Sequence, residues 1–317
     1  MSALRFDGQV AIVTGAGGSF NLGRAHVHLL AQRGAKVVVN DLGIGPGNKG
    51  TDPASAEAVA AEVNAAGGVA IANLGSVAEE NSAHAIIQAA LDQWGRIDIL
   101  INNAGIGLVA DIDEISSRDI GRILDVHLMG AIWMCRAAWP HMRKAGYGRI
   151  VNTTSGAMFG MHGTSIYAAA KFGIYGLTRG LAVEGAAHNI KVNALSPGAA
   201  TNSMGHGLVL TDPVMNENYK KAYPPELVSS AVAYLAHETC AVTGALLQAG
   251  GGNVSARLIS ATSGYTKTGL TLEDVAENVR VIFDDAGATL ATDPYSATGG
   301  GNDALAGLMV RTPYEPS

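Results

Sequence analysis

Residues 10–23 read Val-Ala-Ile-Val-Thr-Gly-Ala-Gly-Gly-Ser-Phe-Asn-Leu-Gly. A short β-branched run enters a glycine-rich turn, and the residues after the turn have the pattern of a helix. Glycines allow backbone amides and a helix N-terminus to come close to a pyrophosphate. The stretch therefore predicts a dinucleotide-binding turn, and we expect the cofactor to contact Gly15, Gly17, Ser19, Asn21, Leu22 and Gly23.

A carboxylate follows the second β-branched run. Asp41 lies 18 residues after Gly23, at the distance where an acidic side chain accepts hydrogen bonds from the adenosine ribose. The same charge repels a 2′-phosphate, and no Lys or Arg lies within residues 15–23 to offset it. These residues favour NAD over NADP. The alternative is a tight turn and a strand-ending Asp that bind no ligand.

Strand patterns alternate with longer amphipathic patterns along most of the chain. The expected strands are Val10–Val13, Lys36–Asn40, Val69–Leu74, Ile97–Asn102, Arg149–Thr153, Lys191–Leu195 and Leu246–Ala249. The expected helices include Pro53–Ala66, Glu79–Trp94, Arg118–Lys144, Ser165–His188 and Pro225–His237. This alternation predicts an α/β fold, with a single Rossmann-like, doubly wound parallel sheet of about seven strands and helices on both faces.

We expect this sheet and its helices to occupy residues 1–252. Residues 253–317 then form a partly helical C-terminal extension that could act as a lid or a subunit contact, and Thr271 is expected to cap its helix. Two long stretches, 42–52 and 196–224, are expected to be irregular.

The composition limits the function classes. Of the 317 residues, 48% are hydrophobic and 15% charged, and the formal net charge is −6. Because there is no basic run, we expect neither nucleic acid nor a membrane as a partner. The N-terminus lacks a charged segment followed by a long apolar one, which favours a cytoplasmic location. Cys135 and Cys240 have no CxxC spacing, so they indicate reduced core thiols and no metal site.

One tyrosine has a suggestive neighbour. Of the nine tyrosines, only Tyr167 has a lysine, Lys171, four positions later. On a helix this spacing puts both side chains on one face, where the ammonium can lower the pKa of the phenol and favour the phenolate. A general acid/base would result. The alternative is an ordinary exposed pair on a helix.

Several short motifs occur in an order that resembles a known family. Thr-Gly in the first turn is followed by Asn102-Asn103-Ala104-Gly105, by a Ser upstream of Tyr167-Ala-Ala-Ala-Lys171, and by Asn193-Ala-Leu-Ser-Pro197-Gly198. This set is similar to that of the short-chain dehydrogenase/reductase family and covers roughly residues 5–252. The resemblance implies an oxidoreductase that uses NAD(H) to interconvert a secondary alcohol and a ketone.

Within the family, the segments VVVNDLG, DVHLMG, RAAWPHM and YGRIV resemble the dehydrogenase part of peroxisomal multifunctional enzymes. That branch oxidises 3-hydroxyacyl-CoA thioesters and some hydroxysteroids. Residues 198–223 predict an apolar lid, which agrees with a bulky apolar alcohol or ketone, or an acyl-CoA, as the substrate.

The resemblance implies four catalytic residues. Tyr167 exchanges a proton with the substrate oxygen, while Lys171 binds the nicotinamide ribose and steadies the phenolate. Ser155 hydrogen-bonds the same oxygen, although the usual spacing falls on Thr154, whose hydroxyl offers the same donor and acceptor. His127 stands where the family commonly has an Asn that holds a proton-relay water, and an imidazole can also hold a water or relay a proton. The alternative for His127 is a purely structural histidine.

The resemblance also extends the set of cofactor-binding residues. The turn departs from the family because it is two residues longer and has Asn21 where a middle Gly is expected, although Asn tolerates the left-handed conformation. For Asn102 we favour a structural role between the central strands. The further expected contacts are Ser76, Val77, Asn103, Ala104, Gly105, Tyr167, Lys171, Pro197, Gly198 and Thr201.

The sequence also suggests how the chain assembles and leaves two other functions open. Small residues crowd the Tyr167 helix, and the family's usual homodimer or homotetramer would use this surface. Two other function classes stay open, a regulator that binds NAD(H) without turnover and an epimerase or dehydratase that retains its cofactor. The intact Tyr, Lys and Ser set argues against the regulator.

Overall fold

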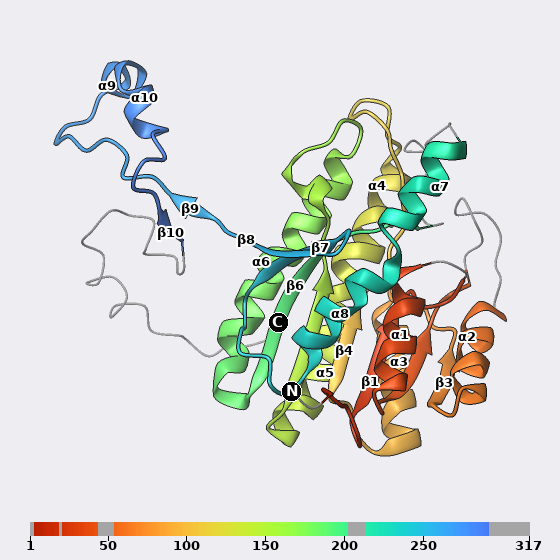
Figure 1. Cartoon of the computed structure of the whole chain (residues 1–317). Helices are drawn as coiled ribbons and strands as arrows, with labels where there is room; N and C mark the ends of the chain where they lie inside the picture. The colour runs from red at the N-terminus through yellow and green to blue at the C-terminus, as the bar shows by residue number, and fades with distance from the viewer. Residues whose placement is uncertain (1–2, 19–20, 44–53, 202–212, 292–317) are drawn as a thin grey trace. The chain divides into compact units, whose positions relative to one another are not determined.

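A sheet of eight strands forms the centre of the first part of the chain (Figure 1). The computed structural model describes residues 3–18, 21–43, 54–201 and 213–291. The strand order is β3-β2-β1-β4-β5-β6-β7-β8, and all neighbours from β3 to β7 pair in parallel. The bounds are β1 Val10–Thr14, β2 Lys36–Asn40, β3 Val69–Asn73, β4 Ile99–Asn102, β5 Gly148–Thr153, β6 Ile190–Gly198, β7 Leu246–Gly250 and β8 Asn253–Arg257.

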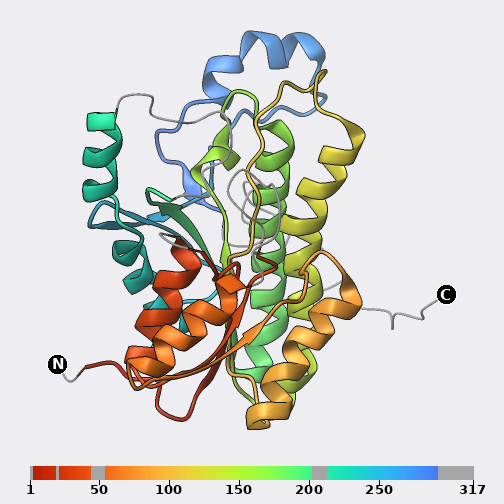
Figure 2. The same ribbon diagram turned by 90° about the vertical axis from the view of Figure 1, so that its right-hand side faces the viewer.

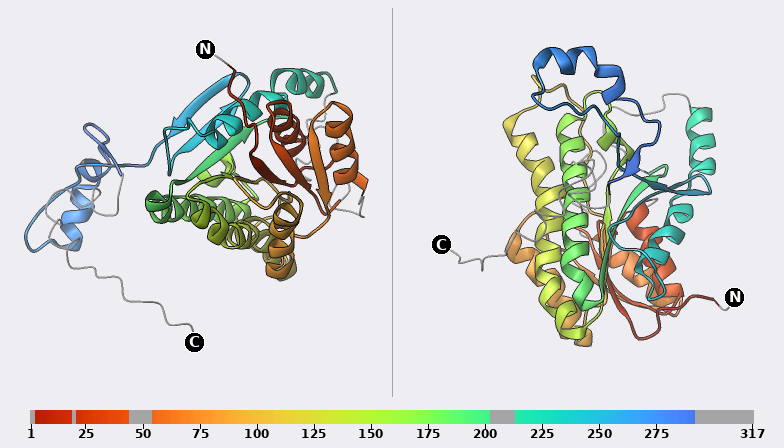
Figure 3. Two further views of the ribbon diagram at one scale, coloured as in Figure 1. Left: turned by 90° about the horizontal axis from the view of Figure 1, so that it is seen from below. Right: turned by 90° about the vertical axis from the view of Figure 1, so that its left-hand side faces the viewer.

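Helices cover both faces of this sheet. One face carries α1 Leu22–Gln32, α2 Ala54–Ala65 and α8 Pro225–Ala236. The other face carries α3 Glu80–Trp94, α5 Gly130–Ala145 and α6 Ser165–Gly185. Figure 3 (left) shows the three layers, and Figure 2 shows α5 and α6 running side by side.

The core is split by the alternation of side chains along the strands. Ala11 and Val13 pack with α1, α2 and α8, whereas Val10 and Ile12 pack with the helices of the other face. Successive residues of a strand point to opposite faces, so a strand with both faces covered is apolar at every position. This explains why the central strands read as continuous hydrophobic runs.

The strands β2 and β3 extend the sheet on one side of β1, and β4 and the strands after it extend the sheet on the other side. β1 pairs with β2 on one side and with β4 on the other. Such a switch leaves a crevice outside the carboxyl ends of the strands, where ligands bind. The fold therefore brings the glycine-rich turn after β1 next to the residues that follow β4.

The expected doubly wound sheet is confirmed, and its seven expected strands correspond to β1–β7. The eighth strand, β8, lies at the start of the expected extension. It follows β7 after a two-residue turn, Gly251–Gly252, in which both residues have positive φ. A turn this short joins antiparallel neighbours.

The helix expected over 118–144 is confirmed: α4 Ser117–Leu124, a π-helical segment Asp125–Met129 and α5 follow one another without a break. One expectation about helices is wrong. Part of the stretch expected to be irregular, Pro213–Ala222, forms α7. Its Pro-initiated start and its Glu and Lys residues favour a helix, but the turn-like residues around it hid the pattern. Most of residues 42–52, and Met204, Leu208, Val209 and Leu210 of the expected lid, lie outside the described residues.

The chain divides into two compact units, residues 1–256 and 257–317. In the second unit, Thr271 and Asp274 form a capping box at the start of α9 Leu272–Glu277, as expected. α10 Val279–Ile282 and a short pairing of β9 Ser260–Ala261 with β10 Thr289–Leu290 complete its described elements. No residue from 257 to 291 is buried. The catalytic role of the first unit, and the role of the extension as a lid or subunit contact, stay predictions.

Within the described ranges, no helix is both long enough and apolar enough to cross a membrane.

The buried His26 of α1 predicts a loss of stability in acid. Its Nδ1 lies 2.7 Å from Ser229 Oγ, and burial lowers its pKa from 6.5 to about 3. Below pH 6.5 the unfolded chain binds a proton that the folded chain does not bind until about pH 3, so the free energy of unfolding falls as the pH falls. We expect His26→Gln to reduce the slope of this free energy against pH by about 1.4 kcal/mol per pH unit in the range below pH 6.5.

Denaturant titrations over this range measure the slope. The matched control is His162→Gln, which replaces a histidine whose side chain is 90% exposed. Equal slopes in the wild type and both variants would contradict the assignment of acid sensitivity to His26.

Candidate active site

The glycine-rich turn is built so that only glycine fits at its key positions. A Cβ on Gly15, whose φ is +63°, would lie 2.6 Å from Ala104 Cα. A Cβ on Gly23 would lie 2.3 Å from the Gly15 carbonyl oxygen. The turn therefore packs tightly against the residues after β4 and against the first turn of α1. Leu22 is the first residue of α1, and Ser19 lies outside the described residues.

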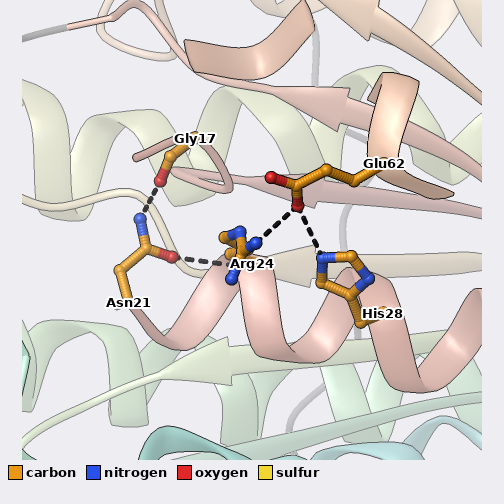
Figure 4. Close-up of polar contacts among 5 residues, drawn as sticks. All are labelled: Gly17, Asn21, Arg24, His28 and Glu62. Carbon is orange, nitrogen blue, oxygen red and sulfur yellow. Dashed lines mark hydrogen bonds and ion pairs between the residues drawn. The ribbon is translucent and has the colours of Figure 1, made fainter. Parts of the chain in front are cut away.

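Asn21 holds the turn to the helix (Figure 4). Its Oδ1 accepts a hydrogen bond from Arg24 N at 2.8 Å, and its Nδ2 donates to the Gly17 carbonyl. Its φ of −135° is extended, so the left-handed conformation expected to be tolerated at Asn21 is not used. Asn21 is a helix N-cap, and the residues of the turn with positive φ are Gly15, at +63°, and Gly18, at +73°.

The N-terminus of α1 is suited to an anion. Its first turn contains no acidic residue, so no carboxylate of α1 itself opposes the positive end of the helix dipole. Arg24 is the nearest cation along the chain, but its guanidinium pairs with Glu62 of α2 at 2.5 Å, and His28 contacts the same carboxylate oxygen at 3.1 Å.

Asp41 lies against the turn, directly after β2. Its Oδ2 accepts a hydrogen bond from Gly17 N at 2.7 Å, and its Oδ1 accepts one from Gly43 N at 2.7 Å. A Cβ on Gly17 would lie 2.1 Å from Ser55 Oγ and 2.8 Å from Asp41 Cγ. The carboxylate expected to recognise the ribose is therefore fixed at the edge of the glycine-rich turn.

The residues after β4 lie across the crevice from that turn. Asn103 Nδ2 donates to the carbonyls of Thr14 and Gly15, each at 2.9 Å. Ala104 contacts Gly15, and a Cβ on Gly105 would lie 2.6 Å from His127 Cε1. Residues 103–105 thus connect the expected cofactor site with the expected catalytic site.

Tyr167 and Lys171 come from the first two turns of α6. Lys171 is 3% exposed, and its Nζ donates to the Thr153 carbonyl at 2.7 Å and lies 5.6 Å from the Tyr167 ring centroid. Burial lowers the pKa of Lys171 from 10.5 to about 7. Lys171 is therefore buried beside the Tyr167 ring, so the two residues are not an ordinary exposed helix pair.

The electrostatics of Tyr167 differ from the sequence expectation. Burial raises the pKa of the phenol above 10.0, and the hydrogen bond with Ser155 acts in the opposite direction. The expected net lowering by Lys171 is wrong for this structure, because desolvation outweighs the other influences on the phenol. Tyr167 therefore carries its proton at neutral pH.

The two neighbouring hydroxyls have different environments. Ser155 lowers the pKa of the Tyr167 phenol and caps the 3-10 helix Gly156–Phe159, its Oγ accepting from Ala157 N at 3.2 Å. Thr154 is 1% exposed and donates its hydroxyl to the Leu195 carbonyl at 3.0 Å. The geometry thus favours Ser155 as the hydroxyl that meets a substrate oxygen and gives Thr154 a structural contact.

His127 lies in the π-helical segment and its ring contacts that of Tyr167. The two rings meet edge to face, with centroids 5.0 Å apart. His127 Nε2 lies 2.8 Å from the Ile106 carbonyl oxygen and 3.2 Å from Ile106 N. Burial, and then the charge of Lys171, lower its pKa to about 3. His127 is therefore neutral near pH 7, so it can hold a hydrogen-bonded partner but does not act there as a charged acid.

The structure also shows the positions of the other residues expected to contact the cofactor. Ser76 Oγ accepts from Ala78 N at 3.2 Å. Val77 is buried against Gly130, and Pro197 and Gly198 end β6 beside β7. Thr201 is the last described residue before the gap at 202–212. Cofactor contacts by these residues stay predictions.

The sequence of this chain matches that of a known protein family. The sequence profile of the family described as short chain dehydrogenase matches residues 9–211, more than half of the chain. The chain belongs to the short chain dehydrogenase family. The family expected from the sequence is confirmed.

Three relatives show how far the similarity extends. This short chain dehydrogenase is 39% identical to peroxisomal multifunctional enzyme type 2 of Mus musculus over 94% of its own length but 40% of that protein. It is 40% identical to a short-chain type dehydrogenase/reductase of Mycobacterium tuberculosis, over 89% of this chain and 96% of that protein. The crystal structure of a short chain dehydrogenase from Mycobacterium avium matches with a TM-score of 0.73 at 35% identity, over 87% of this chain and 94% of that one. The dehydrogenase thus spans less than half of its mouse relative.

One residue of the site was missed from the sequence. Thr153, at the end of β5, holds Lys171 through its carbonyl, and its side chain lines a cavity beside Lys171. A signal was present, because Asn152 and Thr153 are polar residues at the carboxyl end of a buried strand, where ligands of such sheets gather.

Ser155→Ala tests the choice of hydroxyl. If Ser155 hydrogen-bonds the substrate oxygen, its loss should lower kcat by about 10²–10³-fold. Thr154→Val should lower the thermal stability, because the Leu195 carbonyl loses one of its two donors and keeps only Thr154 N, and leave kcat within a few-fold of the wild type. Steady-state kinetics and thermal melts measure both, and a greater kcat loss in Thr154→Val than in Ser155→Ala would reverse the assignment.

Proposed function

We propose that this chain is an NAD(H)-dependent dehydrogenase that interconverts a secondary alcohol and a ketone on a bulky apolar substrate. The observation that carries the proposal is the environment of Tyr167. The Ser155 hydroxyl lowers the pKa of its phenol, and its ring centroid lies 5.6 Å from Nζ of the buried Lys171, at the crevice where ligands of such sheets bind.

The residues present fit a dinucleotide. The glycine-rich turn leads into a helix N-terminus with no acidic residue, and Asp41 lies at the edge of the turn. The carboxylate supports NAD over NADP, because it meets the adenosine ribose where NADP carries a 2′-phosphate. Arg24 does not offset this preference, since Glu62 already neutralises it.

The chain's own groups would handle the proton. When bound, NAD supplies the acceptor for the hydride that leaves the alcohol carbon. In ketone reduction the Tyr167 phenol would give its proton to the carbonyl oxygen and become a phenolate; in alcohol oxidation that phenolate, formed by prior loss of the phenol proton, would take the hydroxyl proton. Ser155 hydrogen-bonds the reacting oxygen, and Lys171 holds the cofactor ribose and the phenol in place. Because burial raises the pKa of Tyr167, ketone reduction starts from the phenol in its protonated form.

The substrate class follows from the surroundings and from the relatives. Val109, Phe159 and Met161 are exposed apolar side chains on the loops that follow β4 and β5, and the loops are joined by a hydrogen bond from Ala110 N to the Gly163 carbonyl at 2.9 Å. They offer an apolar surface on loops at the carboxyl ends of the strands, the edge of the sheet where ligands bind. Together with the similarity to multifunctional enzyme type 2, this supports a 3-hydroxyacyl-CoA-like or hydroxysteroid-like compound.

Assembly and location stay part of the proposal. Ala169, Gly176 and Gly180 form an exposed stripe on α6, which supports a homodimer or homotetramer through this helix. A cytoplasmic location stays a prediction, since the relatives include a protein named as peroxisomal and bacterial proteins.

A substrate panel tests the function. The panel contains 3-hydroxyacyl-CoA thioesters, hydroxysteroids and aromatic secondary alcohols, each with NAD, and NADH formation is followed. We expect stoichiometric NADH release with at least one class. Binding of NADH without turnover of any compound would favour a regulator, and product formation without net NADH would favour an epimerase or dehydratase.

Tyr167→Phe extends this test to the residue at its centre. The variant should lose turnover by about 10³-fold or more, because no other described group replaces the phenol, while its Kd for NADH stays near that of the wild type. Tyr175→Phe, on the same helix, is the matched control and should remain active. Turnover near the wild-type level in Tyr167→Phe would overturn the proposed mechanism.

Asp41→Asn tests the choice of cofactor. Removing the charge should raise the ratio of kcat/KM for NADP to that for NAD by about tenfold or more, because a like-charge repulsion is lost. The amide oxygen can still accept from Gly17 N, so the turn should persist. Asp92→Asn, on the surface of α3, removes the same charge elsewhere and should leave the ratio unchanged. A wild type that prefers NADP would refute the expected NAD preference outright.

A further inference from the structure

Arg24, the first cation after the glycine-rich turn, is held by a carboxylate of another helix. Its Nη2 lies 2.5 Å from Glu62 Oε2 of α2. His28 Nε2 lies 3.1 Å from the same oxygen. Figure 4 shows Arg24 between Asn21 on one side and Glu62 with His28 on the other. The Arg24 side chain is therefore restrained at its charged end, although its backbone belongs to the start of α1.

The backbone of Arg24 is bonded to the expected nucleotide site. Arg24 N donates to Asn21 Oδ1 at 2.8 Å, and Asn21 Nδ2 donates to the Gly17 carbonyl. Gly17 N in turn donates to Asp41 Oδ2 at 2.7 Å. Asn21 and Gly17 thus connect the base of the Arg24 side chain to the carboxylate that supports NAD.

Glu62 draws the guanidinium away from this site. A Cβ on Gly17 would collide with Ser55 Oγ, so the first turn of α2 lies against the glycine-rich turn. Glu62 follows Ser55 by seven residues, which is about 10 Å along a helix. His28 lies one turn after Arg24 on the same face of α1. The shared contact with Glu62 therefore turns the guanidinium along the two helices, away from the end that meets the turn.

The position of this one cation decides the charge next to Asp41. In the described part of the chain no cation contacts the Asp41 carboxylate, which accepts from the backbone N–H groups of Gly17 and Gly43. A 2′-phosphate carries close to two negative charges, and the planar fork of an arginine matches its oxygens. While Glu62 holds Arg24, a 2′-phosphate meets the charge of Asp41 without a compensating guanidinium.

We propose that Glu62 is a specificity-determining residue, which supports the choice of NAD over NADP by holding Arg24 away from the 2′ position of the adenosine ribose. The inference rests on the proposed function, in which the glycine-rich turn and Asp41 bind NAD(H). Asp41 then acts on the ribose directly, whereas Glu62 acts through Arg24 and is a positioning residue.

The exposure of the pair favours this role over a purely structural one. The side chains of Arg24 and Glu62 are 33% and 44% exposed, and ion pairs this open to solvent contribute little to folding stability. The loss of the Glu62 charge should therefore leave the fold intact and free a guanidinium that stays anchored beside the nucleotide site.

Binding of two small nucleotides to the full chain tests the proposal without turnover. Adenosine 2′,5′-bisphosphate and adenosine 5′-monophosphate differ only in the 2′-phosphate, and calorimetry gives the Kd of each. We expect Glu62→Gln to raise the affinity for the bisphosphate relative to the monophosphate by about tenfold or more, because Arg24 can then bind the 2′-phosphate. The matched control is Glu57→Gln, which removes the same charge from an exposed position on α2 closer to Ser55 and should leave this affinity ratio nearly unchanged.

Arg24→Gln completes a double-mutant cycle. With Glu62 present, Arg24→Gln should change the affinity ratio little, because the guanidinium is already held. In the Glu62→Gln background it should remove the whole gain. A gain that persists without Arg24, a similar gain in Glu57→Gln, or no gain in Glu62→Gln would overturn the proposal.

Nucleotide binding and turnover are separate readouts. If the affinity ratios change as expected but no substrate of the panel turns over, the proposed function fails and the role of Glu62 stands. If the panel turns over with NAD while Glu62→Gln leaves the affinity ratio unchanged, the role of Glu62 fails and the proposed function stands.

Discussion

The end of the first strand is bonded directly to the end of the fourth, and the rest of the site depends on this joint. Thr14 Oγ1 accepts from the backbone N–H groups of Asn103 and Ala104, at 3.0 and 3.1 Å. The Asn103 side chain donates back to the carbonyls of Thr14 and Gly15. Because Gly15 touches Ala104, only a residue without a side chain can occupy its position. The joint fixes the glycine-rich turn on β1 relative to the neighbouring β4 and β5, and β5 holds Lys171.

Much of this arrangement could be predicted from the sequence, for a physical reason. Parallel strands that are buried on both faces are recognisable in a sequence as continuous apolar runs, and their carboxyl ends meet at one edge of the sheet. The glycine-rich turn, Asp41 and residues 103–105 could therefore be placed together in advance. Spacing alone left Tyr167 and Lys171 undecided between catalysis and an ordinary helix pair, and the order of the surrounding motifs was needed to choose.

The features that could not be predicted all depend on contacts between distant residues. The π-helical segment Asp125–Met129 coincides with the bonds of His127 to the backbone of Ile106, which no periodic pattern along the helix records. Ser155 and Thr154 both have hydroxyls, and only the Leu195 carbonyl, 41 positions from Thr154, separates their roles. Arg24 and Glu62 are 38 positions apart, so their contact exists only in the folded chain.

Desolvation sets the proton chemistry of this site more than the attraction expected from the Tyr167–Lys171 spacing. Outside a protein the two groups have pKa values of 10.0 and 10.5, so both keep their protons at neutral pH. Burial moves them apart, raising the pKa of Tyr167 and lowering that of Lys171 to about 7. A group whose pKa lies near the working pH gives up and regains a proton most readily. The packing that buries α6 against the sheet therefore also makes Lys171 the more readily titrated member of the pair, while the Ser155 hydroxyl limits how far the pKa of the phenol is raised.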